Sequence, residues 1–219
     1  MKILIALAGG ILLAGTAHAG LFIPKDTTMV MGMYSPDSKM VEASHGFSRD
    51  WSAAVGWHHY ESDDRGDKET IERDFYALRA TYLALRSYGE GIANVYVYGG
   101  PALAHSNEFE DDKLGAQVGL WADYETRRIY TRIAIQTHWT SQFTQTVTTV
   151  QGLWAPYAAD YEDVAAWVGV QLERRNGLSN ATQVTPLLRF FQRDWWIDAG
   201  VSVNETHRGD VFMNLMILF

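Results

Sequence analysis

Apolar residues alternate with polar or small residues along most of the chain. At the C-terminal end, every second residue from Val211 to Phe219 is apolar. A period of two indicates a β-strand, because successive side chains of a strand point to opposite faces. In three further segments one face is wholly apolar, and the other mixes Gly and Ala with polar and aromatic residues: 51–58, 114–124 and 164–173. Such faces are typical of barrel strands that contact lipid on one side and a lumen on the other.

The alternation predicts twelve strands in an all-β chain. Their expected bounds are 27–35, 39–47, 51–61, 73–87, 92–104, 114–124, 128–139, 147–158, 163–174, 183–192, 195–204 and 210–219. Twelve is an even number, as a bacterial single-chain transmembrane barrel requires. Ten strands would remain if the first hairpin, around residues 35–38, did not form. We therefore expect a closed antiparallel transmembrane β-barrel of twelve strands, with ten strands as the alternative.

A soluble sandwich or barrel is the alternative to a membrane protein, because its strands alternate too. Its polar face would point to water and carry many Lys and Glu residues, which are scarce on the polar faces here. The predicted strands also run to about ten residues, the length that a tilted strand needs to cross a bilayer, whereas soluble strands have about five or six. Both features favour the membrane.

The predicted connections differ between the two ends of the barrel. One set is short: 48–50, 88–91, 125–127, 159–162 and 193–194. The other set is mostly longer and more polar: 62–72, 105–113, 140–146, 175–182 and 205–209. Outer-membrane barrels have short periplasmic turns and longer outer loops. We therefore expect both termini to lie in the periplasm.

The N-terminal segment has the layout of a secretory signal peptide. Lys2 gives it a positive start, residues 3–13 form a short apolar run, and the Ala-His-Ala of 17–19 fits a small-residue cleavage signal. We expect cleavage after Ala19, which leaves residues 20–219 as the barrel domain. A retained membrane anchor is the alternative. After the cleavage site no apolar run approaches the roughly 20 residues that a transmembrane helix needs.

Composition narrows the function classes. The chain has 219 residues, of which 47% are hydrophobic and 20% are charged, which fits one folded domain. It has no cysteine, so disulfide bonds and thiolate metal sites are excluded. The histidines show no HxH pattern, and the neighbours His58 and His59 point to opposite faces of a strand. No metal or other cofactor is therefore expected, and the net charge of −8 makes nucleic acid an unsuitable partner.

The signal peptide, the alternating strands and the terminal Phe219 together resemble bacterial outer-membrane β-barrel proteins of Gram-negative cells. The resemblance covers the whole mature chain at the level of architecture. It implies that outer-membrane lipid surrounds the barrel. It also implies that Phe219, at the end of a regular apolar row, is the signal read by the barrel-assembly machinery. No motif of a particular transporter or enzyme accompanies it, so the resemblance implies little about activity.

Charged residues on the predicted inner faces are the candidate functional groups. Three arginines and three carboxylates face the lumen in this assignment: Arg79, Asp123, Arg132, Glu173, Arg189 and Asp198. Neutral polar residues accompany them: Gln117, Gln136, His138 and Gln171. The tight connections place Arg189 opposite Asp198 and Asp123 near Arg132. Such pairs either satisfy charges in a confined interior or form an eyelet that selects small polar or ionic solutes.

Three functions are compatible with these features. The first is passive: a small-solute channel, or a structural barrel with a mostly filled lumen. The second is a membrane-embedded hydrolase acting on lipid or peptide, but no GxSxG motif occurs, and Ser141, His138 and His105 near the outer rim show no catalytic spacing. No catalytic residue is therefore assigned. The third is a surface binding or adhesion protein that uses the acidic outer loops 63–68 and 107–113.

Overall fold

The computed structural model describes residues 23–62, 70–160, 162–179, 181–204 and 208–219. The predicted signal peptide, residues 1–19, and the acidic loop 63–68 lie outside the described residues. The strands of the described part are β1 (Thr28–Ser35), β2 (Ser38–Gly46), β3 (Trp51–Ser62), β4 (Ile71–Tyr88), β5 (Ile92–Ser106), β6 (Lys113–Glu125), β7 (Ile129–Thr140), β8 (Thr144–Trp154), β9 (Ala165–Asn176), β10 (Thr182–Gln192), β11 (Trp195–Val201) and β12 (Val211–Leu218). No helix in this part of the chain is long and apolar enough to cross a membrane.

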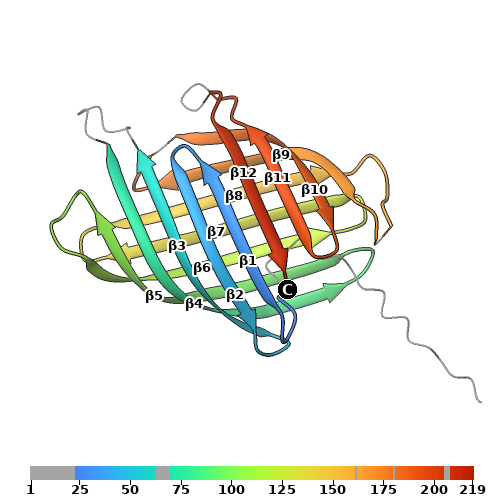
Figure 1. Ribbon diagram of the computed structural model, residues 1–219, viewed down its shortest axis with the longest axis horizontal. Coiled ribbons are helices and arrows are strands. Elements are labelled where there is room, and N and C mark those ends of the chain that lie inside the picture. The colour runs from blue at the N-terminus through green and yellow to red at the C-terminus, as the bar shows by residue number, and fades with distance from the viewer. Residues whose placement is uncertain (1–22, 63–69, 161, 180, 205–207) are drawn as a thin grey trace, which may run out of the picture.

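The strands form one closed antiparallel barrel, in which each strand pairs with its neighbours in sequence (Figure 1). β1 also pairs with β12, so the two ends of the chain close the sheet. Phe219 extends this seam, because its N–H donates to the Thr28 carbonyl oxygen at 2.8 Å and its own carbonyl oxygen accepts from the Thr28 N–H at 3.1 Å. The prediction of an all-β closed barrel with twelve strands, including the first hairpin, is confirmed.

The two faces of the wall differ as the alternation predicts. On β12, Val211, Met213 and Leu215 are exposed on the outside, whereas Phe212 and Met216 are buried on the inside. Exposed aliphatic side chains recur on the other strands in the same way. An apolar outer surface of this extent is stable against lipid rather than water. The chain therefore has the fold of an outer-membrane β-barrel protein.

Aromatic side chains lie on the outer surface near the strand ends. At the end of the barrel where β1 begins and β12 ends, Trp51 packs against Tyr82 with ring centroids 4.8 Å apart, and Trp154 ends β8. Trp139 lies close to the opposite end of β7, and all four side chains are exposed. Aromatic girdles of this kind lie at the level of the lipid headgroups and border the apolar belt.

β8 differs from its predicted bounds at both ends, more than the other strands do. β8 covers Thr144–Trp154 rather than 147–158. Its start is rich in threonine, which is β-branched and suits a strand, and the Thr146 hydroxyl lies 3.0 Å from the Thr137 hydroxyl on β7. Its end comes before Pro156, which has no N–H to donate to a neighbouring strand. The shift therefore follows from local chemistry that the apolar alternation does not report.

The predicted contrast between short and long connections is only partly correct. The connection 141–143 is short, although it was expected to be among the longer ones. The connection 155–164 lies at the end where β1 begins and β12 ends, and it is longer than expected. β11 ends at Val201, before the predicted bound at residue 204.

Apolar side chains fill much of the lumen near its two ends. The terminal-end cluster lies at the end where the first strand begins and the last strand ends. It includes Met29, Tyr130, Trp167, Phe191, Trp196 and Met216. The loop-end cluster at the other end consists of Tyr60, Ile71, Phe75, Ala104 and Leu178, with Phe109 and Phe143 packed against it. The charged side chains of the interior lie between and around these clusters, so the barrel is a packed structure and not a wide pore.

Candidate solute site in the lumen

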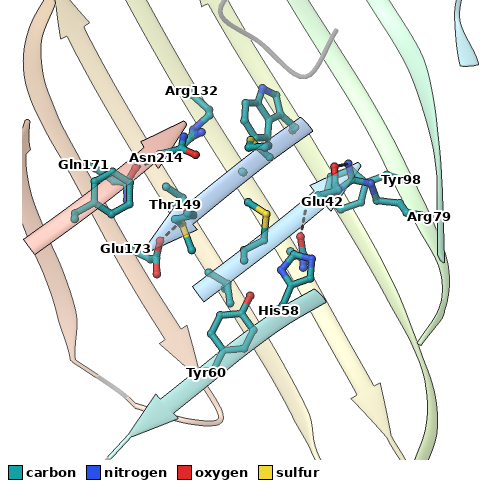
Figure 2. A pocket seen from close by; sticks show the side chains of 18 residues that line it. Glu42, His58, Tyr60, Arg79, Tyr98, Arg132, Thr149, Gln171, Glu173 and Asn214 are labelled. Carbon is teal, nitrogen blue, oxygen red and sulfur yellow. Dashed lines mark hydrogen bonds and ion pairs between the residues drawn. The ribbon is translucent and has the colours of Figure 1, made fainter. Parts of the chain in front are cut away.

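A cavity of about 110 Å³ lies between the two clusters (Figure 2). One water molecule needs roughly 10–15 Å³ of such space, so the cavity has room for a small solute with a few waters. Charged, polar and aromatic side chains from several strands line it: Glu42, His58, Tyr60, Arg79, Tyr98, Trp121, Arg132, Gln136, Thr149, Gln171, Glu173 and Asn214. Its walls can therefore form hydrogen bonds to a polar solute.

Arg189 and Asp198 form a bidentate ion pair. They are opposite each other in the register of β10 and β11, which the tight turn 193–194 connects. Arg189 Nε donates to Asp198 Oδ1 at 2.6 Å, and Arg189 Nη2 donates to Asp198 Oδ2 at 2.8 Å. The guanidinium also lies over the rings of Tyr130 and Trp196, 4.8 and 4.6 Å from their centroids. Both charged side chains are only 1% exposed, so each satisfies the other in the interior.

Asp123 and Arg132 are also opposite each other, on β6 and β7, but they bind different partners. Asp123 accepts from Asn94 Nδ2 at 2.7 Å and from Trp121 Nε1 at 2.8 Å. Arg132 Nη2 donates to Gln171 Oε1 at 3.1 Å, and the guanidinium lies over the Trp121 ring, 4.5 Å from its centroid. Arg132 Nε is buried and has no hydrogen-bond partner among the described residues. The structure thus brings these two residues to one place without pairing their charges.

Arg79 has a carboxylate partner that the sequence reasoning missed. Arg79 Nη2 donates to Glu42 Oε1 at 2.5 Å, and the guanidinium lies 4.9 Å from the centroid of the Tyr98 ring. Glu42 also accepts from the Ser44 hydroxyl at 2.8 Å. Glu42 alternates with Met40 and Ser44 along the buried face of β2, so the period of two contained the signal that places it inside.

Glu173 pairs with Arg175, which the sequence reasoning placed in a loop. Arg175 Nη2 lies 2.7 Å from Glu173 Oε1, and Arg175 Nη1 donates to Asp37 Oδ2 at 2.6 Å. Asp37 belongs to the connection between β1 and β2, across the lumen from β9. Arg175 was missed because β9 continues to Asn176, past its predicted end.

The four neutral polar candidates also face the interior. Gln136 and His138 lie on β7, where their Nε2 atoms are 3.0 Å apart, and the Tyr98 hydroxyl donates to Gln136 Oε1 at 3.2 Å. His138 stacks on Phe75 with ring centroids 4.1 Å apart. Gln171 accepts from Arg132, as described above. Gln117 is buried, but its Oε1 has no hydrogen-bond partner among the described residues.

Arg73 crosses the lumen at the loop end and was not predicted. From β4 its Nη1 donates to Gln145 Oε1 on β8 at 3.0 Å and to the Gly177 carbonyl oxygen at 2.9 Å. Its Nε donates to Glu108 Oε2 at 2.7 Å, and the guanidinium lies 3.9 Å from the centroid of the Phe143 ring. Since β4 and β8 are not neighbours in the sheet, these contacts narrow this end of the lumen.

The residues considered for a hydrolase do not come together. His138 is buried, and its Nδ1 has no hydrogen-bond partner among the described residues. His105 is exposed and its Nδ1 lies 2.9 Å from Asp112 Oδ1. Ser141 lies in the exposed connection 141–143. In the described part of the chain, no three His, Cys, Asp or Glu side chains are grouped to hold a metal ion.

Comparisons with known proteins give likenesses of fold alone. No family model matches the sequence, and no curated protein matches it. Among solved structures, the KdgM porin in complex with disordered oligogalacturonate is similar at 8% identity and a TM-score of 0.47, covering 88% of this chain and 98% of that one. The KdgM porin alone is similar at 8% identity and a TM-score of 0.46, and the match covers 88% of this chain and 98% of that one. CdiB from Acinetobacter baumannii gives 9% identity and a TM-score of 0.31, covering 89% of this chain and 60% of that one. Likenesses at this level do not bear on solute or activity.

Proposed function

We propose that the protein is an outer-membrane channel of narrow bore that lets small polar solutes pass through its lumen. The polar, charged cavity of about 110 Å³ inside an otherwise packed barrel carries this proposal. Buried charge costs folding free energy unless it is paired or hydrated. A barrel with a purely structural role gains nothing from such a cavity, whereas a passage for polar solutes needs one.

The same proposal includes the setting of the barrel. The apolar belt and the aromatic side chains at its borders support a location in the outer membrane. We propose that both termini face the periplasm and that Phe219, 74% exposed at the closing seam, is the contact read by the barrel-assembly machinery. Protease added to intact cells should therefore spare a tag inserted directly after Ala19, which leaves Phe219 as the C-terminal residue.

Single-channel recording in planar bilayers tests the channel. The refolded wild-type barrel should give small, reproducible conductance steps. Arg73→Ala should enlarge them, because Arg73 ties β4 to β8 and to Gly177 across one end of the lumen. Arg174→Ala is the matched control, since Arg174 is exposed on the outer surface and bonds to Asn176 there. Equal steps for wild type and Arg73→Ala would contradict a passage limited at this end.

A structural barrel with a filled lumen is the second candidate. The terminal-end and loop-end clusters favour it, because apolar packing at both ends opposes the entry of polar solutes. It predicts no conductance from a barrel that migrates as folded on unheated gels. The hydrolase and the adhesion protein have no observation in their favour in the described part of the chain.

A further inference from the structure

Arg132 differs from four other arginines that face the lumen. Those four each have a carboxylate partner in an ion pair: Arg73 with Glu108, Arg79 with Glu42, Arg175 with Glu173 and Arg189 with Asp198. Within the described residues, Arg132 makes one side-chain hydrogen bond, to Gln171, which is uncharged. A guanidinium in a confined interior is costly without a counter-charge. The positive charge of Arg132 is therefore not balanced by a carboxylate bound to it in the described part of the chain.

The carboxylate that could balance Arg132 is held by other groups. Asp123 is its register partner, yet both carboxylate oxygens accept hydrogen bonds elsewhere, from Asn94 and Trp121. Glu173 also lines the cavity, but Oε1 is held by Arg175, and Oε2 accepts from the Thr149 hydroxyl at 3.5 Å. The nearby acidic groups are thus already engaged.

Space and polar groups are present at this position. Arg132 lines the cavity of about 110 Å³ together with Gln171 and Asn214, and Figure 2 labels all three around it. Arg132 Nε is unused among the described residues, as is Oδ1 of Asn214, a side chain only 6% exposed. Because the oxygen and nitrogen of an amide are assigned from their surroundings, Asn214 can turn its N–H₂ group toward an anion. The planar guanidinium matches the two oxygens of a carboxylate.

We propose that the cavity binds a small carboxylate anion, of the size of acetate, on the guanidinium of Arg132. The anion accepts from Arg132, and Asn214 supplies a further donor from the facing wall. The Trp121 ring holds the guanidinium from one side, 4.5 Å away. This inference names the solute class of the proposed passage and in that respect rests on the proposed function, but binding can be measured without conductance.

Acetate binding to refolded barrel in a zwitterionic detergent tests the proposal. Saturation-transfer NMR should show saturable binding of acetate to the wild type and roughly tenfold weaker binding of acetamide, its neutral isostere, because the charge supplies most of the affinity. Arg132→Gln should weaken acetate binding by roughly tenfold or more, and Arg132→Lys should retain part of it. Arg174→Gln, a change on the outer surface, should bind acetate as the wild type does.

Several outcomes would overturn the proposal. These are no saturable acetate binding to the wild type, equal binding of acetate and acetamide, or unchanged acetate binding in folded Arg132→Gln. If Arg132→Gln does not migrate as a folded barrel, two other measurements test the site. The wild type should bind acetate more tightly than acetamide, and Arg132→Lys should bind acetate more weakly than the wild type. Conductance without acetate binding would refute this site and leave the channel standing, whereas acetate binding without conductance would refute the channel and leave the site.

Discussion

Two hairpins of the barrel carry the same three residue types on their inner faces and use them differently. In β10–β11, Trp196 and Asp198 lie on one strand, and Arg189 lies opposite the carboxylate. In β6–β7, Trp121 and Asp123 lie on one strand, and Arg132 is again opposite. The first hairpin forms a bidentate ion pair, and the second does not. Register therefore decides which charges are neighbours but not which of them pair.

The indole N–H explains much of the difference. Trp121 Nε1 donates to Asp123, and Asn94 on β5 supplies a second donor to the same carboxylate. Trp196 Nε1 has no hydrogen-bond partner among the described residues, so Asp198 remains available to Arg189. Each arginine stacks on its own tryptophan, at 4.5 Å for Arg132 and 4.6 Å for Arg189. The uncharged donors Asn94 and Trp121 thus occupy the Asp123 carboxylate, and Arg132 does not pair with it.

The largest expected effect is the difference in stability lost when each of the two arginines is replaced. Arg189→Gln leaves Asp198 buried without its counter-charge and should lower the free energy of unfolding by about 3–5 kcal/mol. Arg132→Gln leaves no paired carboxylate behind and should lower it by about 1 kcal/mol or less. Urea unfolding in detergent micelles, followed by tryptophan fluorescence, gives both values. Equal losses in the two variants would break the comparison.

The alternation of apolar residues was enough to predict the barrel and its strand number. It fails at threonine-rich and proline-containing ends such as those of β8, where strand propensity and hydrogen bonding decide the boundary. It also placed Arg189 beside Asp198, because a tight turn fixes the register of a hairpin. It could not predict that Asn94 on β5 donates a hydrogen bond to Asp123. Whether Asn94 or Arg132 binds this carboxylate depends on side-chain geometry, which the alternation does not report.

A smaller effect should distinguish the two tryptophans. Trp121→Phe keeps one six-membered aromatic ring but removes the N–H donor to Asp123. Trp196→Phe makes the same change at an N–H with no partner in the described part of the chain. Both lose some packing, so the difference between them isolates the hydrogen bond to a carboxylate. Trp121→Phe should be the more destabilising change by about 1–2 kcal/mol in the same urea assay. A larger loss in Trp196→Phe would contradict the role given to the Trp121 indole.

The smallest expected effect is the coupling between Asp123 and Arg132. A double-mutant cycle of Asp123→Asn and Arg132→Gln should give a coupling free energy below about 0.5 kcal/mol, since contacts that do not form contribute little beyond additivity. The matched cycle of Asp198→Asn and Arg189→Gln should give a value several times larger, because those side chains share two hydrogen bonds.

Similar couplings in both cycles would mean that Asp123 and Arg132 pair in solution. The unpaired guanidinium on which the anion site depends would then be absent, and acetate binding to the wild type should fail in parallel. A small coupling together with acetate binding would instead show that the charge of Arg132 is directed at the cavity and not at its register partner.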